Sequence, residues 1–316
     1  MAETTVTTPT VTSAVARPRL SARVWVETLV RLLVAAGIAI VFLLPVLWML
    51  SISFKPPTEW LEYPPTLIPK EPLIGNYTFL FNPGNPEGAI AVMTGAAEPV
   101  MPAFINSLII APVATVFSVI IGFLAAYAVS RFRVGGNFMP FFTLTTRMFP
   151  PVAFAVPLLV YYSAVIPSVI PGLRLYDTRL GLILMYIAFT VAFALWMTKG
   201  FIDGVPRHIE EAAILDGASR WRVLFTITLP LVRGGLAATT LFIFILTWTE
   251  FLFALIFTQR YAITVPLQVS HYAGAIGRFY GPQAALGILA SLPVVIAGYL
   301  IQRHLVTGFT FGLIRE

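Results

Sequence analysis

The chain has 316 residues, of which 58% are hydrophobic and only 11% are charged, and its mean hydropathy is +0.87. Soluble domains carry about 25% charged residues, so this composition excludes an ordinary soluble protein and indicates an integral membrane protein. The net charge of +6 does not indicate nucleic-acid binding, because no basic run exceeds Arg131-Phe132-Arg133 and cytoplasmic loops collect Lys and Arg. The absence of cysteine excludes disulfides, thiolate metal sites and a cysteine nucleophile.

The first 23 residues are rich in Thr, Val, Pro and Ala and show no apolar periodicity. They predict a disordered cytoplasmic tail (1–23) ahead of one transmembrane domain (24–316). Arginines then precede the first apolar run, 32–52. A signal peptide is the alternative interpretation, but this run of 21 residues exceeds a typical h-region and no small-x-small site follows it. We therefore expect an uncleaved first membrane helix.

Six segments are long and apolar enough to span a membrane, which takes about 20 mostly apolar residues. They are 32–52, 108–129, 138–162, 180–197, 236–257 and 284–301. The third segment contains four prolines, which free backbone carbonyls at membrane depth. Such carbonyls are tolerated only where protein or a water-filled cavity satisfies them. The expected fold is an all-α polytopic membrane protein with six spans, whose broken third span lines a pathway or a subunit contact.

Lys and Arg are unevenly distributed between the spans. With the N-terminus in the cytoplasm, the inner segments hold 13 of these residues and the outer segments hold 6. Because cytoplasmic loops are enriched in Lys and Arg, both termini are predicted to be cytoplasmic. This topology places the loop 53–103, rich in Pro, Gly and Glu, on the outside and the loop 199–233 in the cytoplasm.

The cytoplasmic loop 199–233 predicts a helix–turn–helix. Pro206 suits a first helical turn, Gly217 suits the position just after a helix, and Ser219 can cap a second helix. Two sets of residues recur at helical spacing, and each is expected to share one face: Ile209, Ala212 and Ala213, then Trp221, Leu224, Phe225 and Thr228. The residue pattern leaves two interpretations open, a partner-docking element and an interfacial helix that merely connects two spans.

Nine positions within 20 residues of this loop form one motif: Glu211, Ala212, Ala213, Asp216, Gly217, Ala218, Ile227, Leu229 and Pro230. The motif resembles the signature loop of binding-protein-dependent ABC importer permeases. Residues 25–316 as a whole resemble the carbohydrate branch, in particular the shorter membrane subunit of maltose-type importers. Asn106-Ser107 and Met148-Phe149-Pro150-Pro151 are supporting matches.

The resemblance implies a permease that moves a sugar, polyol or sugar derivative across the cytoplasmic membrane of a bacterium or archaeon. The loop would be a coupling helix that inserts into a cleft on a cytosolic ATPase, with Glu211 contacting the cleft and Gly217 providing the bend. The implied partners are two ATP-binding subunits, a second homologous permease, an extracytoplasmic solute-binding protein and membrane lipid. It implies no cofactor, no metal and no nucleic acid.

The chain is not expected to be the ATPase itself. A P-loop needs Gly-Lys-[Ser/Thr], so that backbone amides and a lysine cradle phosphate. None of the three lysines, Lys55, Lys70 and Lys199, follows a glycine. We therefore expect no enzymatic activity in this chain. Two further classes stay open, namely a polytopic transporter or membrane enzyme that works without an ATPase, and an interaction scaffold.

Arg147 and Glu250 fall within predicted spans, where a charge is usually functional or paired. Glu250 and the nearby Trp248 are candidates for the lining of a translocation pathway, with the carboxylate accepting hydrogen bonds from substrate hydroxyls and the indole stacking on a sugar ring. The alternative for Glu250 is a structural pair with another span or with the second permease. Arg147 could bind an anionic substituent, pair with Glu250 or cap the broken helix. It keeps open an anionic solute such as a glycerol phosphate or a sulfonated sugar.

Overall fold

The structure is a computed structural model that describes residues 22–82, 99–136, 138–274 and 277–310. Within these ranges, side chains are not described for residues 22–25, 140, 144, 147, 273–278 and 303–310. The predicted tail therefore lies almost entirely outside the described residues, as does part of the loop 53–103. The chain divides into two compact units, Met1–Trp48 and Met49–Glu316, and each is described by itself.

The described chain is helical apart from one short strand pair. Its helices are α1 (Ala22–Ser53), η1 (Pro57–Glu59), α2 (Gly75–Phe81), α3 (Met101–Phe132), α4 (Phe138–Met148), α5 (Pro151–Val160), the π-helix η3 (Tyr161–Val165), α6 (Ile166–Val169), α7 (Arg179–Asp203), α8 (Arg207–Leu215), α9 (Arg220–Val223), the π-helix η4 (Leu224–Thr228), α10 (Leu229–Trp248), α11 (Leu252–Phe257), α12 (Val265–His271) and α13 (Tyr280–Thr310). The strands β1 (Ala273–Gly274) and β2 (Gly277–Arg278) pair antiparallel.

Six helical segments in the described part of the chain are long and apolar enough to cross a membrane. They are Val26–Ser53, Met101–Phe132, Pro151–Val169, Arg179–Asp203, Arg220–Trp248 and Tyr280–Gln302. The predicted all-α, six-span fold is confirmed. The proline-rich third segment is divided where its prolines indicate, since α4 ends at Met148 and α5 begins at Pro151.

Three spans of the second unit pack tightly around small and hydroxyl side chains. A Cβ added to Gly122 of α3 would lie 2.5 Å from Ala194 Cβ of α7, so the two helices touch backbone to backbone. Ser118 Oγ of α3 lies 2.7 Å from Thr190 Oγ1 of α7. Thr115 Oγ1 lies 3.0 Å from Thr247 Oγ1 of α10. Small residues and interhelical hydrogen bonds are the main packing devices of membrane helices, which explains this close contact.

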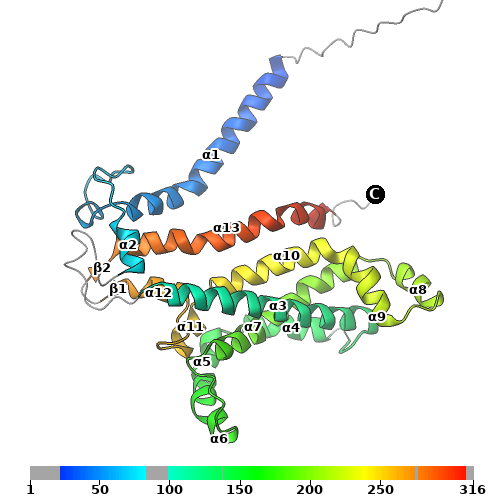
Figure 1. The fold of residues 1–316 in the computed structure, drawn as a ribbon. Helices are drawn as coiled ribbons and strands as arrows, with labels where there is room; N and C mark the ends of the chain where they lie inside the picture. Colours follow the sequence, from blue (N-terminus) through cyan, green and yellow to red (C-terminus); the bar gives the residue numbers. More distant parts are fainter. Residues whose placement is uncertain (1–21, 83–98, 137, 275–276, 311–316) are drawn as a thin grey trace, which may run out of the picture. The chain divides into compact units, whose positions relative to one another are not determined.

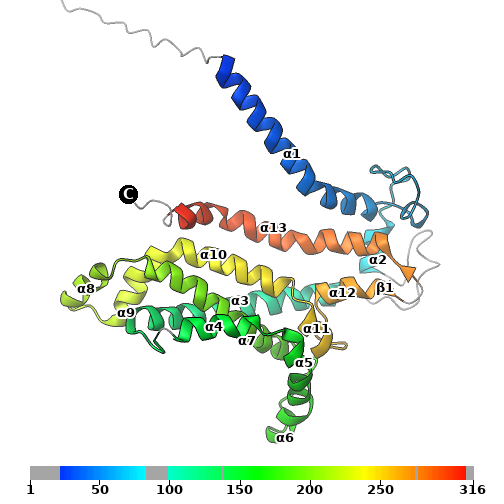
Figure 2. The same cartoon turned by 180° about the vertical axis from the view of Figure 1, so that it is seen from behind.

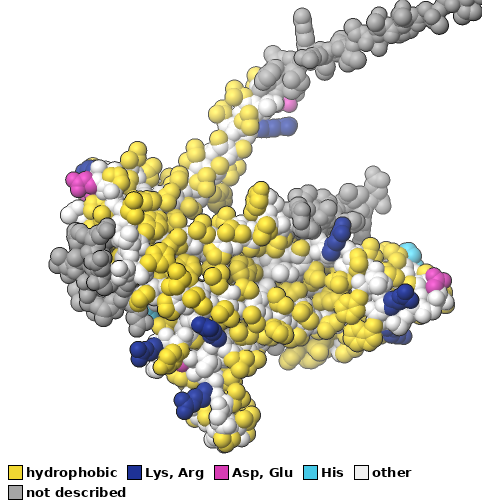
Figure 3. Space-filling model, in the orientation of Figure 1, with side chains coloured by type: hydrophobic (Ala, Val, Ile, Leu, Met, Phe, Trp, Pro, Cys, Tyr) yellow, Lys and Arg dark blue, Asp and Glu magenta, His cyan; other side chains and the backbone are white. Residues whose placement is uncertain are grey.

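Both ribbon views show α8 and α9 projecting beyond the long helices α7 and α10 at one end of this unit, while α12 and the strand pair lie at the opposite end (Figures 1 and 2). We call these the α8 end and the α12 end. Hydrophobic side chains cover most of the visible face between them, and charged side chains lie mostly toward the ends (Figure 3). This distribution suits a body surrounded by lipid at its middle and by water at its ends.

Polar side chains at the α12 end fix the loop between α11 and α12. Asn106 Nδ2 donates to the carbonyl oxygens of Tyr261 and Ile263 at 2.9 and 2.8 Å. Arg179 Nε donates to Asn106 Oδ1 at 2.7 Å. Ser107 Oγ accepts from the amide of Val265 at 2.8 Å. The Asn-Ser pair noted in the sequence therefore anchors a loop more than 150 residues further along the chain.

Asp177 completes this anchor. It adopts a left-handed backbone conformation with φ +54°, and its Oδ1 accepts from the amides of Gln259, Tyr261 and Ala262 at 3.0, 3.1 and 3.2 Å. Asp is among the residues that tolerate this conformation. Consecutive amides pointing at one carboxylate form an anion-binding concavity, and here the anion is part of the protein.

The segment after α1 is polar but well ordered by its own side chains. The carboxylate of Glu59 accepts from the amides of Lys70 and Glu71 at 3.0 and 3.1 Å. Asn76 Nδ2 donates to the carbonyl oxygens of Ser53 and Lys55 at 2.9 Å each. The fully buried Lys55 donates to the carbonyl oxygen of Thr66. Side-chain-to-backbone bonds thus replace regular secondary structure in a segment rich in proline.

Candidate functional site

The loop that carries the nine-residue motif projects from the α8 end. Its first helix, α8, follows Pro206 and contains Glu211, Ala212 and Ala213. The side chain of Glu211 is exposed, and so is Ala212. Leu215, the last residue of α8, is 88% exposed. This loop therefore presents small, acidic and apolar groups at the α8 end of this unit.

The motif glycine ends α8 in a Schellman arrangement. Gly217 has φ +88°, a region that side chains other than glycine rarely adopt. The amide of Ala218 donates to the carbonyl oxygen of Ala213 at 2.9 Å, and the amide of Gly217 donates to that of Ile214 at 3.0 Å. These two bonds satisfy carbonyls that the end of the helix would otherwise leave unpaired. Gly217 thus has the helix-ending role that the sequence predicts.

The second half of the loop begins with the predicted cap. Ser219 Oγ accepts from the amide of Arg222 at 3.3 Å, so Ser219 is the N-cap of α9. Beyond α9 the helix widens into η4, in which the amide of Leu229 donates to the carbonyl oxygen of Leu224. Pro230 comes directly afterwards and has no N–H to give to the carbonyl of Thr226, as a continuous α-helix would require. The Leu-Pro of the motif therefore coincides with a π-turn.

The expected single face of the second helix is wrong. Leu224 and Thr228 are buried, whereas Trp221 is 66% exposed and Phe225 is 51% exposed. Residues three apart are separated by a larger angle around the axis of a π-turn than around the axis of an α-helix. The four residues therefore divide into two faces. The exposed rings of Trp221 and Phe225 stack on each other with centroids 6.1 Å apart and an interplanar angle of 13°. They add an aromatic surface to the exposed loop.

The first helix also differs from expectation, because its most buried residue is charged. Ile209 is 37% exposed, while Glu210 is only 5% exposed. Glu210 Oε2 lies 2.8 Å from Arg131 Nε, and Glu210 Oε1 accepts from Thr228 Oγ1 at 2.8 Å. The face of α8 that packs on the protein is therefore centred on this carboxylate. The local sequence pattern did not single out Glu210 and did not pair it with Arg131.

The C-terminal end of α3 carries further polar contacts to the same region. Arg207 Nη2 donates to the carbonyl oxygen of Ser130 at 2.8 Å, and Ser130 Oγ donates to Asp203 Oδ1 at 2.5 Å. The guanidinium carbon of Arg220 lies 4.9 Å from the ring centroid of Phe132, within cation–π range. The last residues of α3 thus contact the end of α7, the start of α8 and the start of α9.

The candidate pathway residues have separate environments. Trp248 is 3% exposed, and its Nε1 donates to the carbonyl oxygen of Ala290 on α13 at 2.9 Å. Glu250 lies in a break between α10 and α11, where its oxygens accept from the amides of Phe253 and Ala254 at 2.9 and 3.3 Å. Arg147 belongs to α4, but its side chain lies outside the described residues. The pathway-lining role of these three residues stays a prediction.

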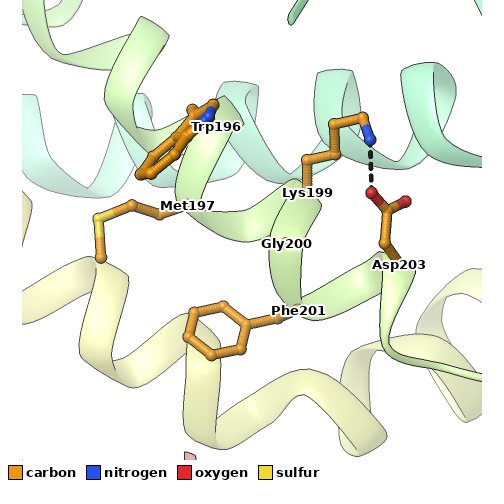
Figure 4. A pocket seen from close by; sticks show the side chains of 6 residues that line it. All are labelled: Trp196, Met197, Lys199, Gly200, Phe201 and Asp203. Carbon is orange, nitrogen blue, oxygen red and sulfur yellow. Dashed lines mark hydrogen bonds and ion pairs between the residues drawn. The ribbon is translucent and has the colours of Figure 1, made fainter. Parts of the chain in front are cut away.

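A shallow pocket of about 350 Å³ opens along the last turns of α7. Six residues of this one helix line it: Trp196, Met197, Lys199, Gly200, Phe201 and Asp203. Figure 4 shows Lys199 and Asp203 pointing toward each other, where they form an ion pair. An indole beside a neutralised charge pair is typical of the membrane–water interface. Among the described residues, no three His, Asp or Glu side chains group closely enough to hold a metal ion.

Comparison with known proteins identifies the class of this loop-bearing membrane protein. Residues 118–310 match the family model described as "binding-protein-dependent transport system inner membrane component", and this range contains the whole motif. The chain belongs to this family. It is therefore a multi-pass inner-membrane permease component, and components of this kind are not themselves enzymes.

Individual relatives span nearly the whole chain. The trehalose/maltose transport system permease protein MalG of Thermococcus litoralis is 34% identical over 298 residues, covering 92% of this chain and 98% of that protein. The inner membrane ABC transporter permease protein YcjP of Escherichia coli is 32% identical over 293 residues, covering 90% and 97%. A chain of a bacterial ABC transporter involved in the import of the acidic polysaccharide alginate superposes with a TM-score of 0.65 at 19% identity, covering 91% of this chain and 99% of that one.

Proposed function

We propose that this chain is the membrane-spanning permease subunit of an ATP-driven importer for a sugar, a polyol or a sugar derivative. Membership of the family supports the permease role. The name of the trehalose/maltose relative, which is similar over nearly its full length, supports the carbohydrate class. The chain would be one half of a channel completed by a second homologous permease, driven by two ATP-binding subunits and supplied by a solute-binding protein.

The observation that carries this proposal is the exposed loop, residues 207–228. It projects at one end of the helical body and presents the motif residues to the surroundings (Figure 1). It exposes Leu215 and the stacked rings of Trp221 and Phe225, and a partner that covers this apolar surface gains the free energy of removing it from water. We infer that the cytosolic ATPase covers this surface, so the α8 end would lie in the cytoplasm, as the Lys and Arg distribution predicts for this loop and for both termini.

The exposed loop can be disabled without touching the membrane spans. Glu211→Ala removes an exposed charge, and Gly217→Pro forbids the φ of +88° on which the helix end depends. The double variant should insert into the membrane normally but lose both uptake and solute-stimulated ATP hydrolysis. The check is an uptake assay together with co-purification of the ATPase from detergent-solubilised membranes. Normal uptake by this variant would remove the coupling role.

Co-purification also separates this proposal from a transporter that works without an ATPase. Such a transporter would retain full uptake when no ATP-hydrolysing subunit accompanies it. An importer for an anionic solute is the alternative within the same architecture, and the presence of Arg147 in α4 is the feature that favours it. Thermal-shift measurements on the partner binding protein, with neutral and anionic sugars compared, decide between the two solute classes.

A further inference from the structure

A buried ion pair connects the C-terminal end of α3 to α8. Arg131 Nε lies 2.8 Å from Glu210 Oε2, and each side chain is 7% exposed. Arg131 Nη2 also donates to the carbonyl oxygens of Ile202 and Val205, both at 3.0 Å. These two carbonyls belong to the last turn of α7 and to the short link that follows it. One guanidinium therefore joins three consecutive parts of the loop region to α3.

Thr228 extends this contact to the start of α10. Its Oγ1 donates to Glu210 Oε1 at 2.8 Å, and the residue is fully buried at the end of η4. Glu210 thus uses one oxygen for Arg131 and the other for Thr228. Each carboxylate oxygen therefore has a protein partner, one on α3 and the other at the end of η4.

The stability that such a pair supplies does not explain its presence. A buried ion pair must repay the loss of water around both charges, and well-packed apolar residues of the same volume are often at least as stable. What a planar, hydrogen-bonded pair provides is a defined geometry between the elements that carry it. The pair therefore indicates that α8 must keep a fixed position relative to α3.

We propose that Arg131, Glu210 and Thr228 form a positioning lock that makes α8 move as one body with the C-terminal ends of α3 and α7. This inference rests on the proposed function, since it concerns how movement of the ATPase reaches the spans. Apart from these three residues, α8 is joined to α7 by the link Gly204–Pro206, which has no side chain at Gly204, and by the contacts of Arg207 and Asp203 with Ser130. With the lock in place, force on the exposed loop reaches α3, which packs against both α7 and α10.

Glu210→Gln tests the lock and leaves the exposed surface of the loop unchanged. The amide can still accept from Thr228, but it cannot pair with the charge of Arg131. In the complete complex, the ATPase should co-purify in normal amount while the solute transported per ATP hydrolysed falls by about two- to thirtyfold, the range that single substitutions between coupled sites produce. A complex that transports as much solute per ATP as the unmodified one would overturn the inference.

Two matched variants make the outcome specific. Lys199→Gln removes another ion pair at the same end of the protein, with Asp203 one turn along the same helix, and should leave the transport ratio unchanged. Arg131→Lys keeps the charge but loses the planar fork, so its ratio should be intermediate. If Glu210→Gln fails to assemble, Thr228→Val is used, since it removes only the hydroxyl donor; an unchanged ratio in an assembled Thr228→Val complex would then count against the lock.

A distance measurement tests the movement directly. The chain contains no cysteine, so spin labels can be attached at His208→Cys on α8 and Ile121→Cys on α3, both exposed positions, without removing native thiols. Their distance distribution should be the same in the resting and ATP-trapped complexes, and Glu210→Gln should broaden it. A shift between the two states in the unmodified lock would overturn the inference. Failure of the ATPase to co-purify with the unmodified chain would instead overturn the proposed function.

Discussion

At the scale of single residues, Gly217 shows how backbone conformation alone can fix a functional turn. A Cβ at this position would meet no atom within 4 Å, so space does not require glycine. The φ of +88° does, because an L side chain in this region is strained. The glycine of the motif is therefore explained by the shape of the chain, independently of any partner.

Gly217→Ala should destabilise the turn by about 1–2 kcal/mol through this strain. Hydrogen exchange of the amides in residues 207–228 should become faster by the corresponding factor. Gly200→Ala is the matched control, because its Cβ also meets nothing within 4 Å and its backbone is helical. Alanine there should be neutral or slightly stabilising. Equal effects of the two substitutions would show that backbone strain at Gly217 is not the cause.

Glu250 is a second residue whose contacts lead to a local prediction. Glu250→Ala removes the acceptor for the amides of Phe253 and Ala254, and loss of such a cap costs about 1 kcal/mol. We expect faster hydrogen exchange at these two amides and little change in the apparent affinity for solute during uptake. Glu250→Gln, which keeps one carbonyl acceptor, should be milder. A raised KM for uptake with unchanged hydrogen exchange would support the pathway-lining role instead.

At the scale of elements, the contact of α3 with α7 depends on a missing side chain. A Cβ added to Gly122 would lie 2.5 Å from Ala194 Cβ and 2.8 Å from the backbone nitrogen of Leu195. Helix backbones can approach this closely in a membrane only where one residue is very small. The hydroxyl pair of Ser118 and Thr190, one turn away, depends on the same approach.

Gly122→Val should push α3 and α7 apart and lower the midpoint of thermal unfolding in detergent by several degrees, because a rigid backbone cannot give way as a flexible side chain can. Gly298→Ala in α13 is the control, since its Cβ would meet nothing within 4 Å. Unfolding followed by tryptophan fluorescence measures both. A Val variant as stable as the Gly298→Ala variant would contradict the close packing.

The sequence predicted the elements better than their internal breaks. Six long apolar runs were sufficient for six spans, because a membrane span requires length and little else. The break after Trp248 was missed, since no glycine or proline marks it. The available signal was Glu250 itself, because an acidic side chain in an apolar stretch can accept from the amide three residues later, here Phe253, and so begin a new helix. The π-turn η4 was also missed, although Pro230 marked the place where an α-helical hydrogen bond is lost.

The site was predicted in part for a similar reason. Gly217 and Ser219 act on neighbouring residues, so local pattern revealed them. Arg131 and Glu210 are 79 residues apart and meet only in three dimensions. The sequence around Arg131 gives no sign of its pairing with Glu210, and the sequence around Glu210 gives none either. The exposed Glu211 next to Glu210 carries the same charge. Spacing alone could not tell which of the two glutamates faces the protein.

At the scale of the whole molecule, orientation in the membrane is the property that connects the fold to its partners. The Lys and Arg distribution predicts that the α8 end is cytoplasmic. Because the chain has no native cysteine, single cysteines report orientation without background. His208→Cys, at an exposed position of α8, should be labelled by a membrane-impermeant thiol reagent only after cells are opened. Tyr63→Cys, in the loop after α1, should be labelled in intact cells. The reverse pattern would invert the topology.

The exposed tip of α8 has a consequence for how the cell makes this protein. A subunit synthesised without its ATPase would hold Leu215 and the stacked rings of Trp221 and Phe225 in water. Such uncovered apolar surface is what chaperones and proteases recognise in incompletely assembled proteins. Orphan copies should therefore be short-lived, and the amount of this subunit in the membrane should follow the supply of ATPase rather than the rate of its own synthesis.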